Sequence, residues 1–414
     1  MGNHEIEAKG LFDKIVWQAI IGVVLILLAY PLVRSFYFAS GLRWQYILIF
    51  SFLTAYFLTP LCRLLALKLN ILDRPDWRKI HIQPTPLFGG LGIYVAFSAS
   101  LLLNGVFLPG MKILLLGATL IFIMGIWDDI RPLPALLKFI FQISVATLVT
   151  VWGDVELTFF YNQSWAPAFN IPVTVLWIVG LTNAMNFFDG IDGLASGMSA
   201  VTSLFLGLIA FKTNQPALGW FAIALLGACV GFLPHNFRFG KSARLFLGDA
   251  GSTFLGFTLA GLAVLGEWSS TSHFVSLSAP ILIFGVLIFD MIYVNLSRIK
   301  NGQAGNFFRL LTCVNKDHLH HRLLFLGFKR KEALFIILTM STCLGFSALI
   351  IMNQNLIEAL LGLFQAILIV GLIVTFMHKG RERMPKEGDR RIWRRRRNDR
   401  LDEETLNEDR GSGT

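Results

Sequence analysis

The sequence predicts an all-α, polytopic membrane protein with about 11–12 transmembrane helices. Of the 414 residues, 55% are hydrophobic and only 15% are charged, whereas a soluble domain has about 25% charged residues. The hydrophobic residues also lie in blocks near the length of a membrane-spanning helix, about 20 residues. Stretches such as residues 21–30 do not alternate between apolar and polar positions, as barrel strands do. These observations exclude a soluble enzyme, a disordered chain and a fibrous protein.

The predicted spans follow one another with short connections. The apolar blocks cover residues 15–35, 45–67, 89–108, 111–127, 135–152, 171–185, 194–211, 216–234, 252–266, 277–297, 334–352 and 357–377. Several are shorter than the usual span of about 17–25 residues, so their ends are approximate.

The distribution of basic residues predicts the orientation. If the loop at 68–88 is cytoplasmic, 20 of the 24 lysines and arginines before residue 378 lie on the cytoplasmic side. The outer four are Arg34, Arg43, Lys112 and Lys212. Because cytoplasmic loops carry an excess of Lys and Arg, both termini are expected in the cytoplasm. The first block lacks a small-residue cleavage site and is expected to remain as a span.

Three regions are expected. Residues 1–44 form an N-terminal segment with an extra transmembrane helix, 45–377 form the membrane-embedded domain, and 378–414 form an Arg-rich, disordered cytoplasmic tail. An arginine run that follows a span on the cytoplasmic side is typical of a solvated tail that reinforces topology or touches anionic lipid, and nucleic-acid binding is not expected. The four cysteines have no CxxC spacing, which predicts neither a metal site nor a disulfide framework.

The acidic residues of the membrane domain gather on one side. Nine aspartates lie at cytoplasmic ends of spans or in cytoplasmic loops: Asp73, Asp76, Asp128, Asp129, Asp189, Asp192, Asp249, Asp290 and Asp317. Charged groups within a bilayer are costly, so such residues have a function or a partner. A translocation path would place acids along the membrane depth. The pattern favours an active site at the cytoplasmic face.

Two of the polar clusters are suited to phosphate and to a metal ion. Lys79 and His81 lie in a basic loop, which can hold phosphate or is an ordinary basic loop. Asp128 and Asp129 directly follow an apolar run. Adjacent carboxylates raise each other's pKa unless a cation lies near, and hard oxygen ligands suit Mg²⁺.

The other clusters lie further along the chain. Asn186, Asp189 and Asp192 are spaced three apart, on one side of a helix if the segment is helical. Asp249, between glycines, is either a metal ligand or a helix N-cap. The histidines of this cluster, which can donate to phosphate oxygens, are His318, His320 and His321. Oxygen-rich surroundings argue against zinc.

In this order, the clusters resemble the polyprenyl-phosphate N-acetylhexosamine-1-phosphate transferase family, of the glycosyltransferase family 4 type. The motifs that carry the resemblance are the acidic pair at 128–129, NAMNFFDGIDGLASG at 183–197, LFLGDAGSTFLG at 245–256 and HLHH at 318–321. HLHH is similar to the branch that uses UDP-GlcNAc or a related sugar. The phospho-MurNAc-pentapeptide transferase branch has three adjacent histidines.

The resemblance implies a reaction and a location. Such enzymes transfer a sugar 1-phosphate from a UDP-sugar to polyprenyl (undecaprenyl) phosphate, release UMP, and begin cell-envelope glycan assembly such as that of lipopolysaccharide or teichoic acid. The protein is then a multi-pass protein of the bacterial inner (cytoplasmic) membrane. Its partners are the UDP-sugar, the polyprenyl phosphate lipid and the membrane. The oligomeric state stays open, with a homodimer among the alternatives.

The chemistry distributes roles over the clusters, because two polyanions must be brought together. The expected cofactor is Mg²⁺, with Mn²⁺ as a substitute, held by Asp249, Asp128, Asp129 and Asn186. The expected catalytic residues are Asp128, Asp129, Asp249 and His321, and either member of the acidic pair can act on the lipid phosphate. The expected substrate-binding residues are Lys79, His81, Asn186, Asp189, Asp192, His318 and His320.

Two alternatives remain. One is a phospho-MurNAc-pentapeptide transferase of peptidoglycan synthesis. The other is a non-catalytic homologue or lipid transporter, for which internal repeats and broken helices at mid-membrane would be expected.

Overall fold

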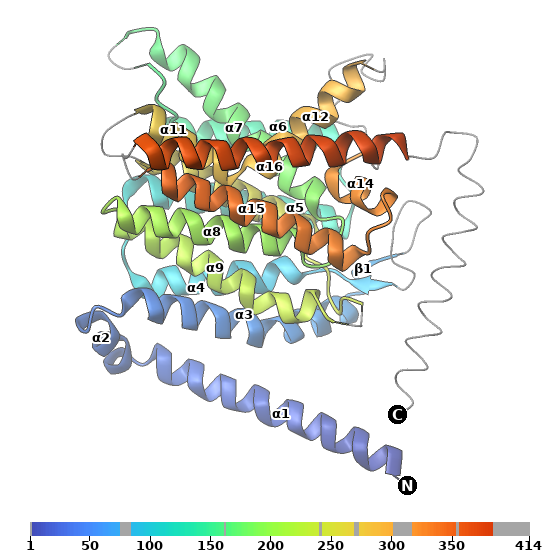
Figure 1. The fold of residues 1–414 in the computed structure, drawn as a ribbon. Helices are drawn as coiled ribbons and strands as arrows, with labels where there is room; N and C mark the ends of the chain where they lie inside the picture. The colour runs from blue at the N-terminus through green and yellow to red at the C-terminus, as the bar shows by residue number, and fades with distance from the viewer. Residues whose placement is uncertain are drawn as a thin grey trace.

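The computed structural model describes residues 2–74, 84–160, 163–239, 242–268, 273–300, 317–352 and 356–383. Within these ranges the chain is almost entirely helical, which confirms the predicted all-α, polytopic membrane fold (Figure 1). Nine of the described helices are long and apolar enough to cross a membrane, or up to eleven if each of two bent pairs is one span. The upper count agrees with the predicted 11–12 transmembrane helices.

The helices follow the apolar blocks closely. Those that can span a membrane singly are α3 (Arg43–Lys68), α5 (Pro109–Ile130), α6 (Ala135–Gly153), α7 (Ala166–Phe188), α8 (Leu194–Lys212), α9 (Pro216–Asn236), α10 (Gly248–Leu265), α15 (Arg330–Ile351) and α16 (Leu356–Glu382). The apolar helix α4 (Gly89–Asn104) is shorter, with 16 residues. A short helix, α14 (Leu319–Phe325), carries part of the histidine motif.

Two predicted spans are not single helices. The first block contains α1 (Gly2–Ala29) and α2 (Pro31–Ala39), which are bent by 66°. Pro31 begins α2 because proline has no N–H to continue α1. The block at 277–297 contains α11 (His273–Ile283) and α12 (Gly285–Lys300), bent by 75°. The expectation of one continuous helix in each block was wrong.

Helix α10 lies at the centre of the bundle, packed against α5 and α7, and almost all of its residues are buried. Glycines permit this packing. A Cβ on Gly125 of α5 would collide with the Cα of Ala250, and one on Gly90 of α4 would collide with the Cα of Gly251. The first turn of α10 is therefore pressed directly against the ends of two neighbouring helices.

A two-stranded antiparallel sheet, which the sequence did not predict, closes one end of the bundle. Strands β1 (Leu72–Asp73) and β2 (Thr85–Pro86) pair with Leu72 opposite Pro86. The backbone N–H of Phe246 donates to the Pro86 carbonyl at 2.9 Å. The sheet thus joins the loop before α4 to the segment that precedes α10. In Figure 1, β1 and α14 lie at the same end of the bundle.

The boundary expected at residue 377 falls inside a helix, because α16 continues to Glu382. The remainder of the predicted tail, from residue 384, lies outside the described residues, as do Lys79 and His81.

Candidate active site

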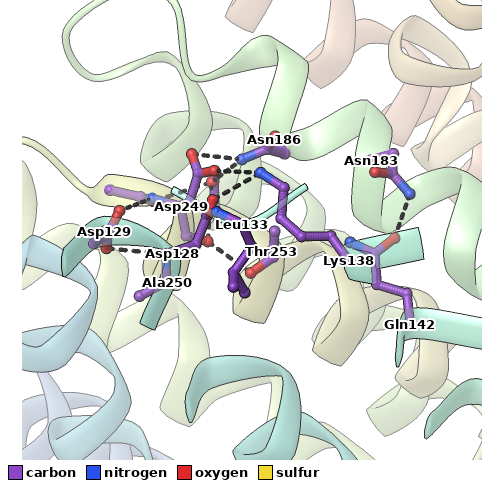
Figure 2. A network of polar contacts seen from close by, with 12 residues as sticks. Asp128, Asp129, Leu133, Lys138, Gln142, Asn183, Asn186, Asp249, Ala250 and Thr253 are labelled. Carbon is purple, nitrogen blue, oxygen red and sulfur yellow. Dashed lines mark hydrogen bonds and ion pairs between the residues drawn. The ribbon is translucent and has the colours of Figure 1, made fainter. Parts of the chain in front are cut away.

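The end of the bundle that carries the sheet also carries the polar clusters. Helices α5 and α7 end there, and α6 and α10 begin there. Packing of α10 against α5 and α7 therefore brings together residues that are more than a hundred positions apart in sequence (Figure 2).

An ion-pair cluster lies at the centre of this end. The ammonium group of Lys138 in α6 lies 2.7 Å from Asp128 Oδ2 and 3.3 Å from Asp249 Oδ2. The side chain of Lys138 is 28% exposed, that of Asp128 is 6% exposed and that of Asp249 is 40% exposed. One cation thus bridges two carboxylates at a site that remains open to solvent on the Asp249 side.

Neutral donors hold both carboxylates in place. The side-chain amide of Asn186 donates to Asp249 Oδ1 at 3.1 Å and to Ser252 Oγ at 2.9 Å. The backbone N–H of Leu133 donates to Asp128 Oδ1 at 2.7 Å. The structure therefore brings three residues predicted for this site, Asp128, Asn186 and Asp249, into one network (Figure 2).

The two members of the acidic pair have different partners. Asp129 accepts hydrogen bonds from the backbone N–H of Asp249, at 2.8 Å, and from that of Ala250, at 3.2 Å. These are unpaired donors of the first turn of α10, so Asp129 caps that helix from a neighbouring one. The cap that the sequence analysis considered for Asp249 is thus supplied by Asp129, and the Asp249 carboxylate points to Lys138.

The donor set fits Mg²⁺ in its usual protein environment. No group of three or more Asp, Glu, His or Cys side chains in the described part of the chain is arranged to enclose a metal by itself. Mg²⁺ is commonly held by one or two carboxylates together with substrate phosphates and water. Asp128 and Asp249 supply two carboxylates that already share one cation.

The segment after α7 forms a second part of this end. Asp192 Oδ2 accepts the backbone N–H of Ala243 at 3.1 Å, and the N–H of Gly193 donates to Asn236 Oδ1 at 2.6 Å. Burial, and then the charges of Asp249, Asp192 and Asp73, raise the pKa of Asp189 to about 8. Three neighbouring carboxylates thus act on Asp189, and its raised pKa favours the neutral, protonated carboxyl group at this position.

The histidine motif packs against this segment. The ring of His318 stacks on Phe187, with centroids 5.2 Å apart, and a Cβ on Gly190 would collide with the His320 ring. His320 is 1% exposed, and neither of its ring nitrogens has a hydrogen-bond partner among the residues that the structure describes. Burial, and then the neighbouring His321 and His318, lower the pKa of His320 well below its usual value, which favours the neutral imidazole. The His321 ring lies 4.1 Å from that of His320, centroid to centroid.

Two residues that the structure brings into these networks were not among the predicted site residues. Lys138 is a single lysine near the start of an apolar block, and an ionisable residue in a span is by default a functional candidate. Asp290 was expected near the cytoplasmic end of its span and not as a site residue. It is fully buried, and its carboxylate lies 2.6 Å from His318 Nδ1 and accepts the backbone N–H of Leu319 at 2.7 Å.

One ion pair and two hydrogen bonds to backbone carbonyls anchor the histidine motif from its other side. Arg298 makes two hydrogen bonds of 2.8 Å to the carboxylate of Asp317. Arg322 donates to the backbone carbonyl of Asp317 at 2.6 Å and to that of Met377 at 2.7 Å. Helices α12, α14 and α16 are thereby joined around the motif.

Fold and site together define a multi-pass membrane protein with a carboxylate–ammonium cluster at one end of its helix bundle. The model of the family described as Glycosyl transferase family 4 matches residues 111–267, which include that cluster.

Curated relatives extend the match over most of the chain. The probable undecaprenyl-phosphate N-acetylglucosaminyl 1-phosphate transferase of Bacillus subtilis is 32% identical over 78% of this chain and 89% of its own length. The decaprenyl-phosphate N-acetylglucosaminephosphotransferase of Mycolicibacterium smegmatis is 29% identical over 78% of this chain and 86% of its own length. The undecaprenyl-phosphate alpha-N-acetylglucosaminyl 1-phosphate transferase of Escherichia coli K12 is 26% identical over 68% of this chain and 76% of its own length.

The chain belongs to the polyprenyl-phosphate N-acetylhexosamine-1-phosphate transferase family, which confirms the resemblance seen in its motifs.

Proposed function

We propose that this protein transfers GlcNAc-1-phosphate from UDP-GlcNAc to polyprenyl phosphate, releasing UMP and forming a lipid-linked sugar diphosphate. The names of the relatives support the acceptor and the transferred group. The observation that carries the chemistry is the bridge that Lys138 makes between Asp128 and Asp249. In the proposed reaction, this positive charge would lie where the diphosphate and the lipid phosphate meet.

The protein residues act mainly by positioning and by charge. The ammonium group of Lys138 stands on a flexible side chain, so it can exchange its carboxylate partners for a phosphate oxygen when substrate binds. Asn186 and the Leu133 N–H keep the two carboxylates in fixed orientations. A phosphate with a second pKa of about 6 is largely ionised at neutral pH, so the lipid phosphate needs no strong base.

Mg²⁺ is the proposed cofactor, with Asp128 and Asp249 as its carboxylate ligands. When bound, it would neutralise the diphosphate and stabilise the departing nucleotide phosphate. Asn186 supports this site by orienting Asp249. Asp129 supports it by fixing the first turn of α10, on which Asp249 stands.

The segment 186–193 and the histidine motif are the proposed site for the nucleotide and the sugar phosphate. His318 is oriented by Asp290, and His320 lies directly against Gly190 in the same segment. A substrate bound there would lie beside the carboxylate cluster, since Asn186 of the same segment donates to Asp249.

A direct assay tests the reaction. Purified protein, Mg²⁺, UDP-GlcNAc and undecaprenyl phosphate should yield UMP and a lipid-linked GlcNAc diphosphate in equal amounts. Release of UDP would indicate transfer of the sugar without its phosphate and would contradict the proposal. Turnover with UDP-MurNAc-pentapeptide alone would instead place the chain in the peptidoglycan branch.

The broken helix pair α11–α12 is the feature that a transporter would share. Its buried acid, Asp290, is however engaged by His318 and by the Leu319 N–H, and does not line an open path. The arrangement favours an enzyme in which the helix after the bend holds a carboxylate against the histidine motif.

We further propose that the site faces the cytoplasm of a bacterium, in the inner membrane. The asymmetry of basic residues supports this orientation. Single cysteines introduced at positions 131 and 316, in a chain without the native four, should react only from the cytoplasmic side, and one at 160 only from outside. Labelling of 131 from outside would reverse the orientation.

A further inference from the structure

A cavity separate from the aspartate cluster lies at the same end of the bundle, between α3 and α9. It has a volume of about 410 Å³, and its walls include Thr59, Pro60, Arg63, Leu64, His235 and Arg244. This volume is within the range of small-molecule sites, about 300–1,000 Å³. None of these residues belongs to the proposed active site.

The cavity is strongly basic. Arg63 and Arg244 line it, and Arg238 lies close enough that its pKa is lowered by burial and then by the charges of these two residues. None of the three forms an ion pair with any carboxylate that the structure describes. Such a concentration of unneutralised charge indicates an anionic ligand.

Arg63, in the wall of the cavity, is held in position by a backbone hydrogen bond. The Nε–H of Arg63 donates to the backbone carbonyl of Arg244 at 3.2 Å. This bond joins α3 to the segment that precedes α10. The two terminal nitrogens of its guanidinium then remain for an external acceptor. A guanidinium binds phosphate through paired, geometrically matched hydrogen bonds.

A buried polar atom also lacks a partner at this cavity. His235 is 8% exposed, and its Nε2 has no hydrogen-bond partner in the described part of the chain. Buried polar atoms are nearly always paired, so an orphan atom lining a cavity points to a ligand that completes it. Nε2 can accept from a hydroxyl group or, when protonated, donate to a phosphate oxygen.

The surroundings identify the ligand as a lipid. On α3, the apolar side chains next to Arg63 are exposed, with Leu61 at 48%, Leu64 at 59% and Leu65 at 40%. They continue the lipid-facing surface of a membrane-spanning helix up to the arginine. A ligand at this place has its charged group at the cavity and its apolar part along the leucines.

We propose that this cavity binds the headgroup of an anionic phospholipid, of which phosphatidylglycerol is the model. Its phosphodiester binds Arg63 and Arg244, and a headgroup hydroxyl reaches His235. The acyl chains lie along Leu61, Leu64 and Leu65.

The bound lipid would stabilise a segment that the active site depends on. The backbone N–H of Ala243 holds Asp192, and Leu245 accepts a hydrogen bond from Asn236 Nδ2 at 3.0 Å. Arg244 lies between these two residues, and the same segment leads into Asp249. Occupation of the cavity should therefore raise turnover. This consequence rests on the proposed function, whereas the lipid site itself does not.

Lipid binding to the delipidated, purified full chain tests the site by native mass spectrometry. The wild type should retain one phosphatidylglycerol that Arg63→Gln/Arg244→Gln binds at least about tenfold more weakly. Lys68→Gln removes the same charge from the same end of α3, outside the cavity walls, and should bind as the wild type does. Equal binding by the double variant, or equal retention of phosphatidylcholine, would overturn the proposal.

Two further arms identify the source of the phosphate. If inorganic phosphate or undecaprenyl phosphate displaces phosphatidylglycerol at lower concentration than phosphatidylglycerol itself binds, the phospholipid assignment is wrong. The variant Arg63→Lys/Arg244→Lys keeps the charges but loses the paired geometry, and should bind with intermediate affinity. This variant also serves if the glutamine variant fails to fold. UMP release in phosphatidylglycerol nanodiscs, compared with phosphatidylcholine nanodiscs, then measures the effect on turnover separately from binding.

Discussion

Asp290 Oδ2 lies 2.6 Å from His318 Nδ1, and both side chains are buried although they stand 28 positions apart in the sequence. The carboxylate fixes the orientation of the imidazole and determines which ring nitrogen carries a proton. His318 also stacks on Phe187. Asp290, in the helix that follows the bend between α11 and α12, is therefore a positioning residue for the histidine motif.

Asp290→Asn should lower kcat/KM by roughly 10- to 100-fold, because a hydrogen bond to a charged group contributes about 1.5–3 kcal/mol. Asp290→Glu keeps the carboxylate and should recover part of the loss, which a purely packing role would not predict. Steady-state rates of the two variants measure the effect. Equal losses in both variants would indicate that Asp290 is only structural.

Lys138→Met should reduce turnover by at least about 100-fold, because it removes the charge that bridges Asp128 and Asp249. Higher Mg²⁺ concentration should restore part of the loss if a second cation can take over the bridging position. Lys112→Met is the matched control, since Lys112 lies near the opposite end of α5 and is exposed. Equal effects of the two substitutions would remove Lys138 from the active site.

Asp249→Asn should abolish detectable turnover, because the change keeps the shape of the side chain and removes its charge. Asp192→Asn should act mainly on KM for the UDP-sugar, since Asn can still accept the Ala243 N–H and preserve the fold. Rates measured over UDP-sugar and Mg²⁺ concentrations separate the two. Near-normal kcat in Asp249→Asn would refute its role as a metal ligand.

Asp129→Ala should destabilise the protein by about 0.5–2 kcal/mol, because two N–H groups at the start of α10 lose their acceptor. Asp128→Asn should leave the cap of α10 intact while turnover falls, since Asp128 caps no helix and Asn can still accept the Leu133 N–H. Thermal unfolding in detergent measures the first effect and UMP release the second. An Asp129→Ala protein as stable as the wild type would argue that the cap contributes nothing.

Gly125→Ala should prevent the close packing of α5 on α10, because the added Cβ would collide with the Cα of Ala250. Gly180→Ala in α7 adds the same group where no atom lies within 4 Å, and should be neutral or stabilising by up to about 1 kcal/mol. Unfolding temperatures of the two variants give the comparison. Similar temperatures would mean that the helices can separate without loss.

The sequence by itself determined the helices and the side of the bundle on which chemistry occurs. The length of an apolar block and its lack of alternation can be read from local sequence alone. The nine long helices of the described residues therefore lie where the apolar blocks are. The motifs predicted the same face for Asp128, Asn186 and Asp249, because each stands at the end of a span. The roles proposed for Lys79 and His81 remain predictions.

The tertiary structure alone decided which polar groups meet. The sequence treats Asp128 and Asp129 as equivalent, yet the crossing of α5 and α10 at Gly125 turns one to Lys138 and the other to the first turn of α10. Lys138 resembles any lysine at a membrane boundary until α6 packs beside α10. A buried charge is stable only with its partner, and partners more than a hundred residues apart are chosen by helix packing, which no local pattern records.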